Sequence, residues 1–551
     1  MLIYVTAMSR ALQCPDLCRL ICEHIGSDDK RTLFRLSLSC RTFMEPAFDV
    51  LWYKLDNFTP LVLCMPRDLY QEVIWQGDPH DNREEISTLV SNGCLFIPQL
   101  FSSSTAVFSK VNARERLEAA AMRVRILNHR EWWGGRMYKA DPNVFRSLAC
   151  AAQGRTGLLP RLQQLTWQTP NDDIYPYIFL FFSPTLTNMD VYVTTGNIAS
   201  DRMRFSLLAS LVPRCPSVRS LRLCARPGST IHSHRDLFSN HSTSAFASFS
   251  LWTSLDVLTL ENIDLSTLTD VLAGLAVLTT LKLHYCQTID PLSPSTVQGF
   301  PMLRHLSMHG SDIDSYLHVF KRMSCTPLVH LNLHGVDAPC ESKWAELFRI
   351  LPGKISRDTL ATVSFNSLIQ DNSGRSVPLR FQTISPLLQF RRITQLSHYA
   401  VPGTCSSLDL GDSDIACIAK AWPCLKTLVL CSPVAVPVSS RLTLRALIAL
   451  AKYCPELEAL EMKINATGVD DYDEKGLYGS RLRTLCVFDS QIDDHDVARV
   501  AAFISDIFPY VKLTSSPVSP LEEMEKKLRC KWEEVGRVIA AAQCKEANQK
   551  K

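Results

Sequence analysis

The chain has 551 residues, of which 46% are hydrophobic and 21% are charged. This apolar content is sufficient for a large buried core, and it excludes a chain that is disordered over most of its length. The 58 basic and 55 acidic residues give a formal net charge of +3, so the composition provides no electrostatic argument for nucleic acid or an anionic membrane surface as a partner.

The N-terminal segment MLIYVTA is a short apolar stretch without a basic flank, which does not fit a secretory signal. Met8 is an alternative start to Met1. No stretch reaches the roughly 18 uncharged apolar residues that a membrane span requires. The 20 cysteines are scattered without a CxxC pair, as small core side chains are in a reducing compartment. We therefore expect a cytoplasmic or nuclear protein.

Residues 10–55 carry apolar side chains at helical spacing. Pro15 suits the first turn of a helix, and residues 26–29 (GSDD) combine a helix stop with a new helix start. We expect a compact helical module here. A module of this size is small for an independent core, so it needs a partner or the neighbouring domain. The apolar positions are Cys14, Leu17, Cys18, Ile21, Cys22, Ile25, Leu33, Leu36, Phe43, Phe48, Leu51 and Trp52.

Cys14, Cys18 and Cys22 lie four residues apart and therefore share one face of a helix. Three such thiols are one possible metal site, but no fourth ligand is suitably spaced. A free cysteine otherwise behaves as a small hydrophobic side chain. We predict that all three pack in the core of the module.

Residues 56–157 are predicted to form a helical linker that also caps the N-terminal end of the next domain. Within it, residues 117–127 (LEAAAMRVRIL) have the pattern of an amphipathic helix. Trp132 and Trp133 precede two glycines, and we expect them to pack under the first strand of that domain. The alternative is an aromatic platform that binds a peptide.

From residue 158 to 512 the pattern LxxLxL recurs about 12 times. Its clearest copy, LTTLKLHYCQTI, matches the leucine-rich-repeat pattern LxxLxLxxC. The central positions are 23 to 37 residues apart, and the longer intervals leave room for a fuller helix. One copy would be weak evidence, but a dozen at a bounded period argue against chance. The central positions are Leu165, Met189, Leu221, Leu258, Leu281, Leu306, Leu331, Val363, Leu396, Leu428, Leu460 and Leu485.

We therefore predict an α/β fold that consists of the helical module and an irregular leucine-rich-repeat solenoid. In such a solenoid parallel strands line the concave face and helices the convex face. Residues 513–551 should form a C-terminal helix that covers the exposed edge of the last repeat. The apolar residues of that helix at i, i+3 and i+4 spacing are Leu521, Met524, Leu528, Trp532 and Val535.

The segment CPDLCRLICEHIGSDDKRTLFRLSLSCRTFMEPAFDVLW resembles an F-box. It departs from the family at Cys14, where the family has leucine. An F-box followed by irregular leucine-rich repeats is similar to fungal F-box/leucine-rich-repeat proteins, and this resemblance covers nearly the whole chain. The matching positions are Cys14, Pro15 and Leu17 (Leu-Pro-x-Glu-Leu in the family), Ile21 and Ile25 (first-helix hydrophobic positions), Leu33 (after the acidic turn), Cys40 (Val-Cys-Arg), and Leu51 and Trp52 (terminal Leu-Trp).

The resemblance implies a substrate receptor of a Skp–cullin–F-box ubiquitin ligase. The nine matching positions would bind a Skp-type linker protein and, through it, a cullin, while the repeats would hold an unknown protein substrate. The chain itself would perform no catalysis and would need no metal or cofactor. In agreement, the sequence contains no Gly-rich phosphate loop, no GxSxG and no HExxH. The alternative is a non-catalytic leucine-rich-repeat scaffold without a ligase role.

Three consecutive repeats place histidine at the outward position that follows the LxL pair. Strand alternation points this residue away from the inward leucines. We predict a partner-binding patch whose charge changes near pH 6.5, the unperturbed histidine value. One alternative is that histidine is merely tolerated on a half-exposed strand; a zinc site is disfavoured because strand ladders seldom provide a closed tetrahedron. The patch consists of Lys282, His284, His305, His309, His330, Asn332 and His334.

Overall fold

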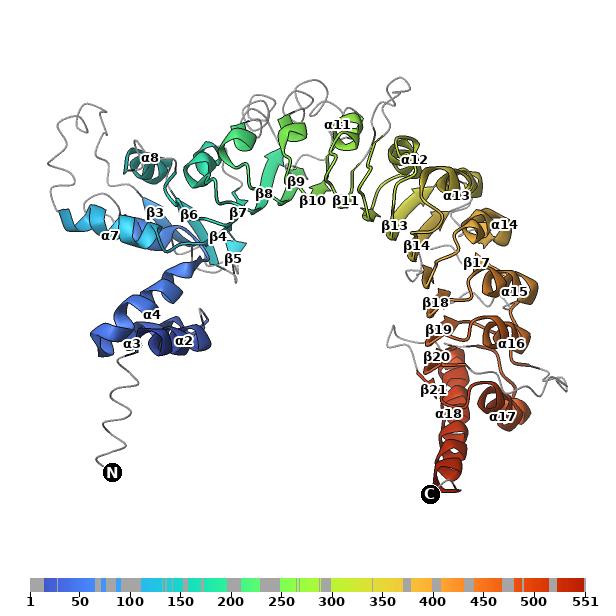
Figure 1. Cartoon of the computed structure of the whole chain (residues 1–551). Coiled ribbons are helices and arrows are strands. Elements are labelled where there is room, and N and C mark those ends of the chain that lie inside the picture. Colours follow the sequence, from blue (N-terminus) through green and yellow to red (C-terminus); the bar gives the residue numbers. More distant parts are fainter. Residues whose placement is uncertain are drawn as a thin grey trace, which may run out of the picture. The chain divides into compact units, whose positions relative to one another are not determined.

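The computed structural model describes the greater part of the chain, and its elements are shown in Figure 1. The described residues form two compact units, Met1–Ile263 and Asp264–Lys551. They are residues 14–26, 28–64, 71–75, 86–90, 111–130, 132–133, 136–140, 142–151, 157–169, 173–195, 210–227, 248–263, 265–266, 268–286, 288, 299–338, 340–369, 378–398, 408–430, 441–467, 480–487, 490–514 and 523–549.

The largest sheet among the described residues has 15 strands, with parallel pairing of neighbours within each unit. This confirms the prediction of an α/β fold with a large parallel, solenoid-like sheet. The first unit contributes, in order, β1 (Lys54–Leu55), β4 (Ile126–Arg130), β7 (Gln164–Gln168), β8 (Asn188–Thr195), β9 (Ser220–Pro227) and β10 (Val257–Glu261). The second contributes β11 (Thr280–His284), β12 (His305–His309), β13 (His330–Ala338), β14 (Thr362–Ile369), β16 (Gln395–His398), β18 (Thr427–Leu430), β19 (Ala459–Met462), β20 (Thr484–Cys486) and β21 (Lys512–Leu513).

Three helices open the first unit: α2 (Pro15–Ile25), α3 (Lys30–Ser39) and α4 (Arg41–Tyr53). Gly26, with φ 75°, ends α2, and the Asp29 side chain caps α3 by accepting a hydrogen bond from the Thr32 N–H at 3.1 Å. The last helix, α4, runs directly into β1. The small core of this helical module consists of Cys18, Cys22, Leu33, Phe43 and Ala47.

Residues 56–157, predicted as a helical linker, contain strands as well as helices. They contain α5 (Thr59–Leu63), α7 (Val111–Ala121) and α8 (Pro142–Ala151), but also β4 and a separate four-stranded sheet. That sheet consists of β2 (Gln71–Trp75), β3 (Ile86–Val90), β6 (Arg136–Ala140) and β5 (Trp132–Trp133). For Trp132 and Trp133 the structure describes the backbone of β5 and not the side chains, so their expected packing under the first strand stays a prediction.

The parallel sheet therefore begins before residue 158. The expected helix over residues 117–127 ends at Ala121, and β4 starts at Ile126. Leu127 pairs with Leu55 on one side and with Leu165 on the other, and all three are buried. The residues of β4 alternate between half-buried and buried side chains. Pairing on both sides outweighs the local helical pattern, since tertiary context commonly overrides propensity.

In the second unit the predicted central positions pair with one another across neighbouring strands. Leu281, Leu306, Leu331 and Val363 form one such row, and each is at most 1% exposed. The row continues through Leu396, Leu428, Leu460 and Leu485. Helices lie along one side of these strands (Figure 1), including α12 (Ile313–Lys321), α13 (Glu341–Lys354), α15 (Asp412–Ala421), α16 (Leu444–Tyr453) and α17 (Val497–Ile507).

The C-terminal helix α18 spans Glu523–Gln549 and packs against α17 and β21. The Trp532 indole N–H donates to the Ser490 carbonyl at 2.8 Å, and Val535 is fully buried. The helix thus covers the final strand, where a repeat sheet would otherwise expose an edge. None of the described helices is long and apolar enough to cross a membrane.

His129, on β4, lies in an aromatic cluster of the first unit. Its ring centroid is 4.9 Å from that of Phe58 and 4.6 Å from that of Trp167, and Phe145 completes the cluster. The residue is 1% exposed, and neither ring nitrogen has a hydrogen-bond partner among the described residues. Burial lowers the pKa of His129 to about 3, so the ring is neutral at pH 7.

We expect His129→Phe to flatten the pH dependence of stability below pH 6.5. Between pH 6.5 and 3 the unfolded chain binds a proton at this position that the folded chain does not, so the wild-type free energy of unfolding falls as the pH falls. Between pH 6.5 and 5 this loss is about 2 kcal/mol. Urea denaturation at both pH values tests it, with the exposed-site variant His24→Phe as control. Equal pH dependence in His129→Phe and wild type would contradict this assignment.

Candidate partner-binding surfaces

The nine residues predicted to bind a linker protein differ in exposure. Cys14, Pro15, Leu17 and Cys40 are exposed, while Ile21, Ile25, Leu51 and Trp52 are half-buried. Leu33 is fully buried in the core of the module. Its side chain therefore acts through the fold of the module rather than by touching a partner.

Large exposed apolar side chains that were not selected from the sequence lie on the same helices. Leu20 is 61% exposed, Phe34 52% and Leu38 70%, while the predicted Leu17 is 36% exposed. At about 100° per residue, Leu20 lies roughly 200° around α2 from the core residue Cys18. Both helices therefore carry apolar side chains beyond the face that packs in the core. This wide apolar distribution is the sequence pattern that could have identified Leu20, Phe34 and Leu38. We call Leu17, Leu20, Phe34 and Leu38 the apolar surface of the module.

The three cysteines of α2 do not behave alike. Cys18 and Cys22 pack in the core with no exposed surface, as predicted. Cys14, in contrast, is exposed at the N-cap of α2, because the helix begins one residue later at Pro15. Burial raises the pKa of the Cys22 thiol, which keeps it protonated and disfavours metal ligation by a thiolate.

The histidine patch of the second unit is formed by three neighbouring parallel strands. His284, His309 and His334 pair in register across β11, β12 and β13, and His305 pairs with His330. These side chains alternate with buried leucines and are exposed or half-buried. The predicted outward alternation is therefore present. We call Lys282, His284, His305, His309, His330, Asn332 and His334 the histidine ladder.

Two of the three ring pairs in the ladder stack between neighbouring strands, and the third, His309–His334, is tilted at 42°. The centroids of His305 and His330 are 4.5 Å apart with an interplanar angle of 9°. In the second column the separation is 5.9 Å from His284 to His309 and 6.5 Å from His309 to His334. The ladder thus presents two columns of imidazole rings whose centroid separations range from 4.5 to 6.5 Å.

A left-handed residue follows each histidine of the longer column. These residues are Tyr285, Gly310 and Gly335, with φ of 54°, 70° and 65°. A Cβ atom at Gly310 would lie 2.3 Å from Tyr285 Cδ1, so only glycine lets the Tyr285 ring pack there. That ring meets the His309 ring edge-on at 5.3 Å. Tyr285 is half exposed and borders the ladder. The sequence did not predict its position, because no residue pattern indicates a tyrosine in the left-handed conformation.

The surroundings of His334, on β13, favour the neutral form of its ring. Burial, and then the neighbouring His309, lower the pKa of His334 below its usual value. The His334 Nε2 atom lies 3.2 Å from the Ser364 hydroxyl. The Nδ1 atom of His309 is buried without a hydrogen-bond partner among the described residues. Within this column, burial therefore favours the neutral form of His334, and the protein encloses Nδ1 of His309.

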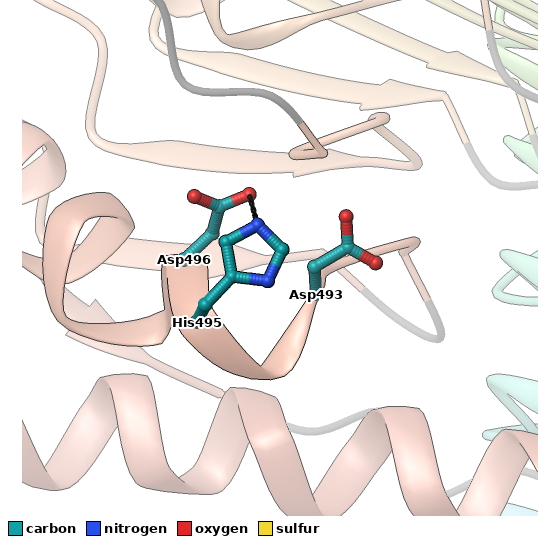
Figure 2. A group of neighbouring side chains, drawn as sticks. All are labelled: Asp493, His495 and Asp496. Carbon is teal, nitrogen blue, oxygen red and sulfur yellow. Dashed lines mark ion pairs between the residues drawn. The ribbon is translucent and has the colours of Figure 1, made fainter.

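Within the part of the chain that the structure describes, three potential metal ligands converge at Asp493, His495 and Asp496 and not in the ladder (Figure 2). This group lies just before α17. Asp496 forms an ion pair with Arg499 at 3.6 Å, and its neighbour Asp494 pairs with Lys531 of α18 at 2.9 Å. We assign these carboxylates to the start of α17 and to the attachment of α18.

No protein-family model matches the chain, and a search of curated proteins found no match. The apolar surface of the module and the histidine ladder are therefore the features from which we infer a function.

We expect NMR titration to give His334 a pKa below 6.5. His309→Gln removes a neighbouring positive charge that forms as the pH falls, so the pKa of His334 should rise while staying below 6.5, because burial is the larger cause. His305→Gln, in the other column, is the matched control and should leave it unchanged. An identical His334 titration in wild type and His309→Gln would show that the two rings are not coupled.

Proposed function

We propose that the chain is a non-catalytic substrate-recognition subunit of a Skp–cullin–F-box ubiquitin ligase. In this proposal the helical module is an F-box that binds a Skp-type linker protein and, through it, a cullin. The strand units are leucine-rich repeats whose histidine ladder contacts a protein substrate. The complex would act in the cytoplasm or nucleus.

The observation that carries the proposal is the apolar surface of the module. Single exposed leucines are ordinary, but here four large apolar side chains lie on two short helices. The core beneath them has only five buried residues. Burying one such side chain against a partner contributes about 1.5–3 kcal/mol, so this surface offers a partner a substantial binding energy.

The attachment of the module to the sheet supports the same proposal. Helix α4 continues into β1, and the Arg125 N–H donates to the Tyr53 carbonyl at 3.0 Å. The Arg123 guanidinium pairs with Glu45 and, at 2.9 Å, with Asp49, both on α4. Such contacts hold the linker-binding helices against the first strands. A receptor that presents substrate to a transfer partner needs that kind of fixed geometry.

The alternative is a leucine-rich-repeat scaffold without a ligase role. In that case the apolar surface would bind another protein, or would bind the linker protein without recruiting a cullin. Co-purification with both the linker protein and a cullin separates the two functions.

We expect the combined variant Leu17→Ser, Leu20→Ser and Phe34→Ser to abolish co-purification with the Skp-type linker protein and cullin. Losing three buried side chains should weaken binding by at least 100-fold. Leu251→Ser changes a leucine outside the module that is 70% exposed, and it is the control. Circular dichroism must show that the triple variant retains its helix content. Leu33→Ala is unsuitable for this test, because it leaves a cavity in the core and destabilises the module. Undiminished linker binding by the folded triple variant would overturn the F-box assignment.

We expect His284→Ala, His309→Ala and His334→Ala together to reduce substrate capture while leaving linker binding intact. Proximity-labelled ubiquitinated proteins, compared with and without the substitutions, measure capture. His495→Ala removes an exposed histidine elsewhere and is the control. Unchanged capture by the triple variant, together with loss caused by a different patch of the sheet, would place the substrate site outside the ladder.

A further inference from the structure

A cavity of about 560 Å³ lies within the first unit, between the helical module and the first strands of the parallel sheet. Its lining comes from α2, α4, the segment before β4 and the residue Arg161 ahead of β7. This volume is within the range of about 300–1,000 Å³ that is typical of small-molecule sites. None of the linker-binding or substrate-binding residues discussed above lines it.

Four arginines line the cavity: Arg19, Arg123, Arg125 and Arg161. Arg123 is neutralised by Glu45 and Asp49. The other three have no ion-pair partner among the described residues. Glu23 is the remaining carboxylate of the lining, so the unpaired groups sum to three positive charges and one negative charge.

Arg125 is held in place by the surrounding backbone. Its N–H donates to the Tyr53 carbonyl, and its own carbonyl accepts from the N–H groups of Gln163 and Gln164 at 2.8 and 3.0 Å. Its Nη1 donates to the Met122 carbonyl at 2.8 Å. The guanidinium is thus preorganised rather than free in solvent, and this lowers the cost of binding a ligand.

Arg125 and Arg161 also repel each other. Burial, followed by the charge of Arg161, lowers the pKa of Arg125. Two like charges against a partly desolvated cavity wall are unfavourable unless an anion lies between them. Guanidinium groups bind both carboxylate and phosphate with paired N–H donors, but the net charge of the unpaired lining groups, three positive and one negative, favours the more highly charged phosphate.

We propose that this cavity binds a phosphate group, held by Arg125 and Arg161 with Arg19 at its rim. The site is independent of the proposed ligase function. The phosphate belongs either to a small free molecule or to a phosphorylated side chain, and the two sources present the same chemistry to the arginines.

Isothermal titration calorimetry of the full chain tests the proposal with two probes, pyrophosphate and a short phosphoserine peptide. We expect at least one probe to bind, and binding to weaken as the salt concentration rises. Arg125→Gln and Arg161→Gln should each reduce the affinity about tenfold or more, because each removes charge-assisted hydrogen bonds. Arg219→Gln, an exposed arginine of the same unit outside the cavity, should leave the affinity unchanged. Binding of only one probe identifies the source of the phosphate.

Thermal unfolding provides the fold control. Without ligand, Arg161→Gln should be at least as stable as the wild type, because it removes a repulsion and no ion pair. If neither probe binds the wild type, or if a probe binds Arg161→Gln and Arg125→Gln as tightly as the wild type, the proposal is overturned.

Discussion

The two-residue alternation of parallel strands determines most of this structure. On one face, the central leucines and their equivalents stack in an unbroken row within each unit, and their burial provides the main stabilisation. The opposite positions are then forced outward in equally regular columns. The histidine ladder is a consequence of this geometry: once Leu281, Leu306 and Leu331 pair, His284, His309 and His334 must also be neighbours.

The helical module, in contrast, has only a small buried core. Cys18 and Cys22 fill the interface where larger side chains would bury more surface, and the apolar surface remains outside. Under the proposed function, a partner that covers the apolar surface would add the burial that this module lacks, and α4 continues directly into β1 of the sheet. The cavity with Arg125 lies at this attachment. An anion there would add contacts between the helical module and the segment before β4, whatever partner the module binds.

The repeat pattern predicted the central row and the ladder because both depend on spacing alone. Strand β4 was missed because ILNHR does not contain LxxLxL and follows a convincing helical segment; its neighbours β1 and β7 decide its conformation. Leu33 and Leu20 show a second limit. Family matching selects positions without telling whether a side chain faces the core or the solvent, and that depends on how α2, α3 and α4 pack. Arg125 and Arg161 are 36 positions apart, so nothing local indicated that they share a cavity.

The central claim is that α2 and α3 form the docking surface for a Skp-type linker protein. Hydrogen–deuterium exchange of the full chain, free and mixed with the purified linker protein, tests it directly. Docking on α2 and α3 should add protection over residues 15–39, where the apolar surface lies, and change little over the ladder strands β11 to β13. Absence of protection in α2 and α3, or protection confined to the sheet, would contradict it.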